Sequence, residues 1–155
     1  MQLTARYIVD APVDRVWDLL MDPVAIASCL PGCQEMHALG DDRYQADLVV
    51  ALAAITGSYA ATVAIEEKVP PRSYRLVVQG NGRPGFVKGT ATVTLEAEGA
   101  GTAVAIDATG QVGGLIARVG QRLLDGVARS MMNKFFACMA ARLTTAPPGS
   151  SELPS

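Results

Sequence analysis

Residues 113–143 read GGLIARVGQRLLDGVARSMMNKFFACMAARL and differ in periodicity from the sequence before them. Their apolar side chains recur at steps of three and four residues, the spacing that places side chains on one face of an α-helix. Charged and amide side chains lie largely on the opposite face. The stretch therefore predicts one amphipathic helix of about seven or eight turns. Its apolar stripe consists of Leu115, Ile116, Val119, Leu123, Val127, Met131, Phe135, Met139 and Leu143.

The sequence from residue 36 to residue 112 alternates apolar and polar side chains, which is the pattern of half-buried β-strands. Turn signals such as Gly40-Asp41-Asp42 and Pro70-Pro71 separate the segments. Connections this short favour antiparallel pairing of consecutive strands over parallel crossovers. The alternation predicts an inner face made of Tyr44, Leu48, Val50, Tyr59, Ala61, Val63, Ile65, Leu76 and Val78.

The N-terminal region predicts one strand followed by short helices. Residues 2–10 alternate in polarity, and Pro12 suits the first turn of a helix because its missing N–H has no partner there in any case. Asp22-Pro23 ends that helix, and residues 24–30 form one more short helical segment. The apolar face of the first helix consists of Val13, Val16, Trp17 and Leu20.

These elements predict one α+β domain over residues 1–145, followed by a flexible tail over residues 146–155. One apolar sheet face and one apolar helix stripe must cover each other. The economical arrangement is a curved antiparallel sheet wrapped around the long C-terminal helix.

The composition bears on the interior of this domain. Half of the 155 residues are hydrophobic, but only 5% are aromatic and 15 are glycine. Small side chains bury area while filling little volume. Such a composition fits either an apolar cavity between helix and sheet or a compact interior in which the backbones approach closely.

The charge and the cysteine content limit which kinds of partner and which cellular compartment we expect. The net charge is −2 with no basic block, so nucleic acid is not an expected partner. The sequence shows neither a signal peptide nor the ~18 apolar residues of a membrane span. Three cysteines, an odd number, then predict reduced thiols in the cytoplasm.

Cys29 and Cys33 flank a Pro31-Gly32 pair, and His37, the only histidine, follows four residues later. This spacing suggests three alternatives to a simple turn: a metal site, a Cys–His nucleophile pair or a disulfide. Pro31-Gly32 breaks any helix that would align the three residues, no fourth zinc ligand is evident, and no acid is evident beside His37. We therefore expect a turn backed by small apolar thiols, with no metal site and no catalytic residue.

The stretch APVDRVWDLLMDPVAIASCLPGC, residues 11–33, resembles the opening of the carbon monoxide dehydrogenase G-subunit family, a branch of the START-like polyketide cyclase superfamily. The resemblance continues in GFVKGTATVTL, residues 85–95, and through residues 112–143. It covers roughly residues 2–143. The motifs that carry it are Ala11-Pro12, Val16-Trp17, Asp22-Pro23, Pro31-Gly32-Cys33, Gly113-Gly114, Gly120 and Phe135-Phe136.

The resemblance implies the helix-grip fold and a non-enzymatic accessory protein of a molybdenum hydroxylase of the carbon monoxide dehydrogenase type. It implies a bound quinone or lipid as the only cofactor, and a role in membrane association or electron transfer to quinone, with a peripheral position at the inner face of the cell membrane. Two alternatives stay open: an assembly factor without ligand, and a cyclase- or dehydratase-like enzyme. The enzyme would need a polar group in the cavity, and the candidates are Tyr44, Tyr59 and His37.

We place the apolar ligand between helix and sheet, near the N-terminal half of the helix. Phe86, Val87 and the loop GNGRPG, residues 80–85, are expected at its mouth, as a glycine-rich lid or as an ordinary hairpin turn. The predicted ligand-lining residues are Leu20, Ile26, Leu30, Tyr44, Leu48, Tyr59, Val63, Leu76, Val78, Phe86, Ile116, Val119, Leu123, Val127 and Met131.

Four basic residues fall near the same end of the predicted helix and the same loop. They are either solvated surface or contacts for acidic lipid headgroups or an acidic partner. They are Arg83, Lys88, Arg118 and Arg122.

Overall fold

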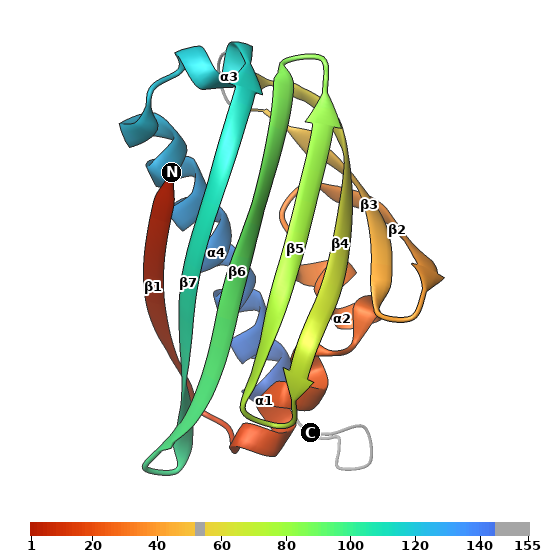
Figure 1. Ribbon diagram of the computed structural model, residues 1–155. Helices are drawn as coiled ribbons and strands as arrows, with labels where there is room; N and C mark the ends of the chain where they lie inside the picture. Colours follow the sequence, from red (N-terminus) through yellow and green to blue (C-terminus); the bar gives the residue numbers. More distant parts are fainter. Residues whose placement is uncertain (52–54, 145–155) are drawn as a thin grey trace.

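The computed structural model describes residues 1–51 and 55–144, and it shows seven strands in one antiparallel sheet (Figure 1). Strands β2 to β7 pair in chain order, as their short connections predict, and β1 pairs with the free edge of β7. The sheet order is therefore β1-β7-β6-β5-β4-β3-β2. The strands are β1 (Gln2–Val9), β2 (Cys33–Gly40), β3 (Arg43–Val50), β4 (Gly57–Val69), β5 (Ser73–Gly82), β6 (Gly85–Glu98) and β7 (Gly101–Gly114).

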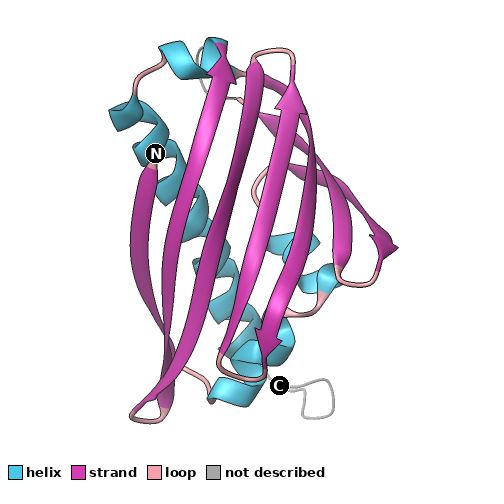
Figure 2. Cartoon of the chain, in the orientation of Figure 1, coloured by secondary structure: helices cyan, strands magenta, loops and turns pink. Residues whose placement is uncertain are grey.

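The helices lie on one side of the curved sheet, which confirms the predicted α+β architecture (Figure 2). The long helix crosses this inner face, and the two N-terminal helices pack near its C-terminal end (Figure 1). Asp22 begins the second helix, because its Oδ1 accepts a hydrogen bond from the Val24 N–H at 3.0 Å. The helices are α1 (Val13–Leu20), α2 (Pro23–Cys29), α3 (Leu115–Arg118) and α4 (Gln121–Thr144).

The prediction of one unbroken helix over residues 113–143 is wrong at its beginning. Strand β7 continues to Gly114, and the helical stretch divides into α3 and α4 at Val119-Gly120. Gly120 has a φ of +98°, a conformation that residues with side chains rarely adopt. The apolar spacing continues across this break, so periodicity alone did not reveal it.

Cross-strand register places the predicted inner-face residues together. Tyr74, which contacts Trp17 of α1, is opposite Val93, and the neighbouring pairs alternate from there across the sheet. Side chains on that face point toward the helices because strand side chains alternate between faces. The same face carries Tyr44, Leu48, Val50, Tyr59, Ala61, Val63, Ile65, Leu76 and Val78, as predicted.

The larger of two apolar clusters, here called the α1–α2 cluster, fills the end of the interior beneath the N-terminal helices. Trp17 meets Tyr74 edge-on at 5.5 Å between ring centroids, and Tyr7 stacks on Phe136 at 4.4 Å. The buried members are Val9, Ala11, Val16, Trp17, Leu20, Ala25, Cys29, Tyr74, Val93, Leu95, Val104, Phe136, Met139 and Leu143.

A smaller cluster, here called the α3 cluster, closes the opposite end. Ile55, Ile116 and Leu124 are its buried members. The Tyr59 hydroxyl donates a hydrogen bond to the Ile55 carbonyl at 2.7 Å. Partly buried side chains that pack against the cluster are Val50, Tyr59, Val112, Val119 and Val127.

The Pro31-Gly32 turn connects the short helices to the sheet, as predicted. The Cys33 N–H donates to the Leu30 carbonyl at 3.1 Å, and Gly32 has a φ of +78°. A Cβ at Gly32 would stand 2.2 Å from the Val49 carbonyl oxygen, so the chain passes too close to β3 for any side chain there.

The structure corrects the prediction of three reduced thiols. Cys29, at the end of α2, forms a disulfide with Cys138 of α4, and Cys33 remains free. The partners are 109 residues apart in sequence. Because α2 packs against α4 only in the folded chain, the local spacing of Cys29 and Cys33 drew attention to the wrong pair.

The GNGRPG segment is a hairpin turn, one of the two predicted alternatives, and the lid interpretation stays a prediction. Strand pairing extends to Gly82 opposite Gly85, which leaves only Arg83 and Pro84 in the turn. Pro84 is buried, and its carbonyl accepts a hydrogen bond from the Ile116 N–H at 3.0 Å. This contact attaches the turn to the first residues of α3.

Within residues 1–51 and 55–144, no helix combines the length and apolarity that crossing a membrane requires. The tail predicted for residues 146–155 lies outside the described residues. So do residues 52–54, within the alternating region of residues 36–112.

Candidate functional site

Five of the predicted ligand-lining residues lie between the two apolar clusters. Within the described chain they belong to neither cluster, although four of them are on the inner face of the sheet and the fifth is one turn after Val127 on α4. All five are only partly buried. We call them the central band: Tyr44, Leu48, Val63, Val78 and Met131.

The sheet next to the central band carries small residues on its inner face. Ala46 is opposite Ala61 on the neighbouring strand, and Ala61 is opposite Gly80. A Cβ added to Gly80 would have one described neighbour within 4 Å, the Ala61 Cβ at 3.8 Å. Small side chains protrude little from the sheet, so helix α4 has no large side chain at these positions to pack against. Further small residues on the same face are Gly89, Ala91, Ala108 and Gly110.

The other predicted lining residues divide between the clusters and the surface. Leu20 is buried in the α1–α2 cluster, with Ile26 and Leu76 packed against it. Ile116 is buried in the α3 cluster, against which three more predicted residues pack: Tyr59, Val119 and Val127. Leu30 is partly buried at the end of α2, whereas Phe86 and Leu123 are exposed.

Two hollows lie at the α3 end of the molecule. One of about 590 Å³ follows the start of α4 and is lined by predicted residues Val119, Leu123 and Val127 together with Gly120, Arg122, Gly126 and Ser130. The other, of about 380 Å³, is lined by Met1, Phe86, Gly110, Gln111, Val112, Ala117, Gln121 and Leu124. Val127 lines the first hollow and also packs against the α3 cluster, but the lining of this hollow includes no residue of the sheet or of the central band.

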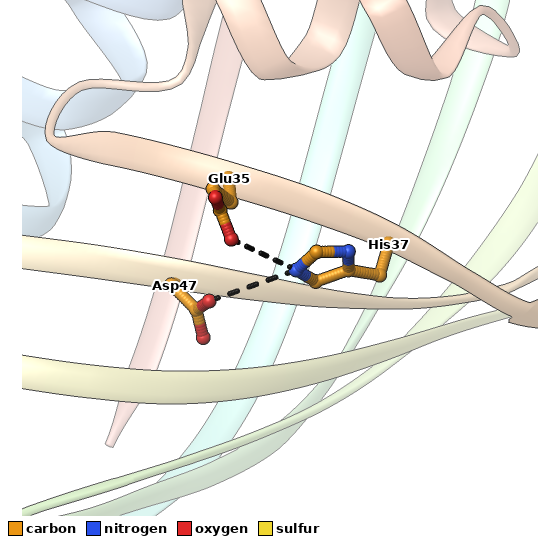
Figure 3. A group of neighbouring side chains, drawn as sticks. All are labelled: Glu35, His37 and Asp47. Carbon is orange, nitrogen blue, oxygen red and sulfur yellow. Dashed lines mark hydrogen bonds and ion pairs between the residues drawn. The ribbon is translucent and has the colours of Figure 1, made fainter.

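The polar candidates for an enzyme are separated by the fold. Tyr44 and Tyr59 are on the inner face, and burial raises the pKa of the Tyr59 hydroxyl. His37 lies on the outer face of β2, where Glu35 and Asp47 approach its ring (Figure 3). The prediction that no acid lies beside His37 is therefore wrong, and the imidazole lies on the opposite side of the sheet from Tyr44 and Tyr59.

Sequence reasoning missed the Glu35–His37–Asp47 group. Glu35 and His37 are two residues apart on one strand, a spacing that places both on one face and that could have drawn attention to them. Asp47 joins them only through the pairing of β2 with β3, in which it is opposite Glu35. That pairing includes a register shift between Cys33 and Glu35, which the sequence pattern does not reveal.

The curved antiparallel sheet gripping a long helix places the chain in the START-like class of folds. A START superfamily protein from Mycobacterium smegmatis superimposes with a TM-score of 0.71 at 12% identity, covering 92% of this chain and 96% of that one. A protein from Chromobacterium violaceum superimposes with a TM-score of 0.70 at 19% identity, covering 94% and 99%.

The chain belongs to the CoxG family, that of the G subunit of carbon monoxide dehydrogenase, whose profile matches residues 6–144. This family consists of accessory proteins of carbon monoxide dehydrogenase. A conserved protein from Geobacillus kaustophilus has 33% identity and a TM-score of 0.89, covering 92% of this chain and 95% of that one. No curated protein sequence matches this chain.

Proposed function

We propose that this chain is a non-enzymatic accessory protein of a molybdenum hydroxylase of the carbon monoxide dehydrogenase type. It holds one apolar molecule, a quinone or a lipid, between α4 and the inner face of the sheet. Bound there, a quinone serves as an electron acceptor for the partner enzyme, and a lipid links the complex to the membrane. Family membership supports the choice of partner enzyme. The partly buried apolar side chains on the inner face of the sheet support an apolar ligand.

The observation that carries the ligand proposal is the incomplete burial of the central band. Leu48, Val63 and Val78 face the helix side of the sheet, yet they remain partly accessible and join neither cluster among the described residues. Apolar side chains in such a position gain free energy when an apolar molecule replaces water. Ligand pockets are commonly lined this way, with few polar groups. Tyr44 supplies a hydroxyl within the band.

The test adds a larger side chain on the inner face of the sheet beside the central band, at a residue that belongs to neither cluster. Gly80→Val places a branched side chain beside Ala61, at a strand position that suits valine. The untagged protein, purified from bacteria, is extracted with solvent and the extract is analysed by mass spectrometry before and after incubation with decylubiquinone or phosphatidylcholine vesicles. We expect one quinone or lipid per chain in the wild type and at least about a tenfold smaller amount in Gly80→Val, the loss that corresponds to about 1.4 kcal/mol.

The control is Gln79→Val, which adds the same side chain to the exposed face of the same strand and should leave ligand content unchanged. Thermal unfolding distinguishes a hollow from a packed interior. Overpacking costs about 1–3 kcal/mol, so a strongly destabilised Gly80→Val protein would indicate that the space is already filled. Wild-type protein that retains neither quinone nor lipid would contradict the proposal.

We further propose that the α3 end of the molecule contacts the membrane surface. Four apolar side chains are exposed there, and we call them the end patch: Phe86 (40%), Val87 (38%), Leu115 (53%) and Leu123 (50%). Phe86 and Val87 point to opposite faces of β6, so these side chains share one end of the molecule and not one face. Exposed apolar side chains commonly mark contact sites. Exposed basic residues that suit acidic headgroups lie on the same elements or, for Arg83, in the turn before β6: Arg83, Lys88, Arg118 and Arg122.

A further inference from the structure

The outer face of the sheet carries a group of metal-binding side chains at its β2–β3 edge. Glu35 and His37 project from the same face of edge strand β2, and Asp47 projects beside them from β3 (Figure 3). Their neighbours Met36 and Ala46 point the other way, toward the helices. The group therefore lies on the opposite side of the sheet from the central band.

Three ligand atoms converge in this group. His37 Nε2 is 3.1 Å from Glu35 Oε2 and 3.8 Å from Asp47 Oδ2, and the ligand atoms of the three residues all lie within 4.8 Å of one another. Two ligand atoms that share one zinc ion at about 2.1 Å stand roughly 3.0–3.4 Å apart. Small side-chain rotations at an exposed site are enough to reach that spacing, and the backbone need not move.

The charge of the group favours an added cation. Two carboxylates face one imidazole, so the group stays negative whether or not His37 is protonated. All three side chains are substantially exposed, with 66%, 54% and 42% of the side chain accessible for Glu35, His37 and Asp47. Ion pairs this exposed contribute little to stability, so a contribution to folding does not account for the convergence.

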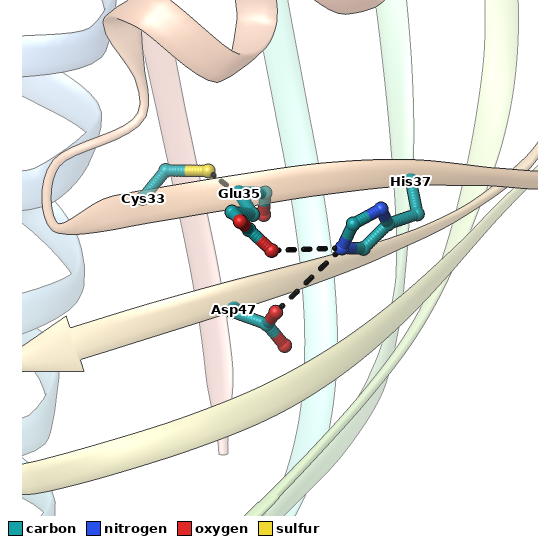
Figure 4. Close-up of polar contacts among 4 residues, drawn as sticks. All are labelled: Cys33, Glu35, His37 and Asp47. Atoms are coloured by element: carbon teal, nitrogen blue, oxygen red, sulfur yellow. Dashed lines mark hydrogen bonds and ion pairs between the residues drawn. The ribbon is translucent and has the colours of Figure 1, made fainter.

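The donor set selects the kind of ion. One imidazole nitrogen with two carboxylate oxygens suits a borderline divalent ion such as Zn²⁺, whereas Mg²⁺ and Ca²⁺ prefer oxygen ligands alone. The free Cys33 lies on the same strand, but its thiol is directed at the Glu35 backbone carbonyl, with Sγ 3.6 Å from that oxygen (Figure 4). Its sulfur is not among the converging ligand atoms.

We propose that Glu35, His37 and Asp47 bind one Zn²⁺-type divalent ion on the outer face of the sheet. Three protein ligands leave at least one position of the ion to water or to an atom of another molecule. The site does not depend on the apolar ligand proposed above, because the sheet separates the two.

The test uses untagged protein, in which His37 is the only histidine. Zinc binding is measured by calorimetry near neutral pH, and the ¹⁵N-labelled imidazole is followed by NMR as zinc is added. We expect one equivalent of zinc and a shift of the Nε2 resonance. His37→Gln, Glu35→Gln and Asp47→Asn should each weaken binding at least about tenfold, since even partners beyond the direct ligands change metal affinity by that much.

Two control variants should leave zinc affinity unchanged. Cys33→Ser removes the neighbouring thiol, and Glu98→Gln removes an exposed carboxylate that pairs with Arg6 elsewhere on the sheet. The proposal is overturned if zinc binding follows Cys33, if the carboxylate variants bind as well as wild type, or if no zinc binds. Magnesium at the same concentration should not displace zinc, and displacement would overturn the assignment of the ion class.

Discussion

At the scale of single residues, Gly32 and Tyr74 show how local chemistry constrains this fold. Gly32 occupies a left-handed conformation directly against a backbone carbonyl of β3, so two separate requirements exclude a side chain. Tyr74 is 6% exposed and its ring packs on Trp17, so its hydroxyl is kept from water at the centre of the α1–α2 cluster. A substitution at each of these two residues tests the corresponding constraint.

Gly32→Ala should destabilise the protein by more than the left-handed backbone alone costs. That conformation costs an L-residue about 1–2 kcal/mol, and the added Cβ would also force β3 away from the turn and weaken the hydrogen bond from the Val49 N–H to the Gly32 carbonyl. Urea denaturation measures the loss. Gly99→Ala is the matched control, because Gly99 also has a positive φ but nothing lies within 4 Å of its added Cβ. Equal losses in the two variants would contradict the steric argument.

Tyr74 predicts a loss of stability at alkaline pH. Burial raises the pKa of the Tyr74 hydroxyl far above its usual value near 10, because the charged form is poorly solvated. Above pH ~10 the unfolded chain releases this proton and the folded chain keeps it, so the free energy of unfolding falls by up to about 1.4 kcal/mol per pH unit. Below that pH the contribution is fully present.

Urea denaturation between pH 8 and pH 11 measures this dependence. Tyr74→Phe should remove most of the slope above pH ~10, whereas Tyr59→Phe, at a less buried tyrosine, should remove less. Identical slopes for the wild type and Tyr74→Phe would show that another group controls alkaline unfolding.

At the scale of elements, the disulfide between α2 and α4 joins the N-terminal helices to the last helix. Arg142 of α4 also reaches α2, donating a hydrogen bond to the Ser28 hydroxyl at 3.2 Å. These contacts hold the C-terminal half of α4 across the sheet, while Gly120 separates its beginning from α3. One end of the helix is thus covalently attached, and the other borders the hollow of about 590 Å³.

Cys138→Ser should lower the free energy of unfolding by about 2–4 kcal/mol, because a cross-link that closes a long loop restricts the unfolded chain. Denaturation of the wild type with and without reductant provides the comparison, and reduced wild type should match the variant. Cys33→Ser, at the free cysteine, should have no such effect. Three titratable thiols in the native protein, with no response to reductant, would show that the bond does not form.

At the scale of the whole molecule, the two apolar clusters occupy opposite ends of the interior and the central band lies between them. A helix laid across a curved sheet can pack closely only where large side chains fill the distance. The aromatic side chains do so at the α1–α2 end, whereas alanine and glycine on the middle strands do not. The same molecule exposes its end patch next to basic residues at the α3 end.

Leu115→Ser together with Leu123→Ser should weaken binding to vesicles that contain acidic lipids by about tenfold or more. Burying a leucine side chain contributes about 1.5–3 kcal/mol, and these two are half-exposed in the free protein. Co-sedimentation with vesicles of phosphatidylglycerol and phosphatidylcholine measures the partition. Val24→Ser removes an exposed apolar side chain on α2 and should change nothing. Equal sedimentation of all three proteins would exclude the end patch as the contact.

The sequence alone was enough to predict most of the strands and helices, the antiparallel order of strands β2 to β7, and the face on which Tyr44, Val63 and Val78 lie. These features follow from periodicity and turn chemistry, which are local along the chain. The family motifs between residues 11 and 143 added the class of fold.

Which distant residues meet follows from the folded arrangement of the elements and not from local sequence. The Cys29–Cys138 bond depends on how α2 packs on α4, and the approach of Asp47 to His37 depends on a register shift in β2. The attachment of Pro84 to Ile116 likewise depends on a contact between elements. Local pattern cannot specify such pairs, because the free energy that selects them comes from packing and hydrogen bonding across the whole chain.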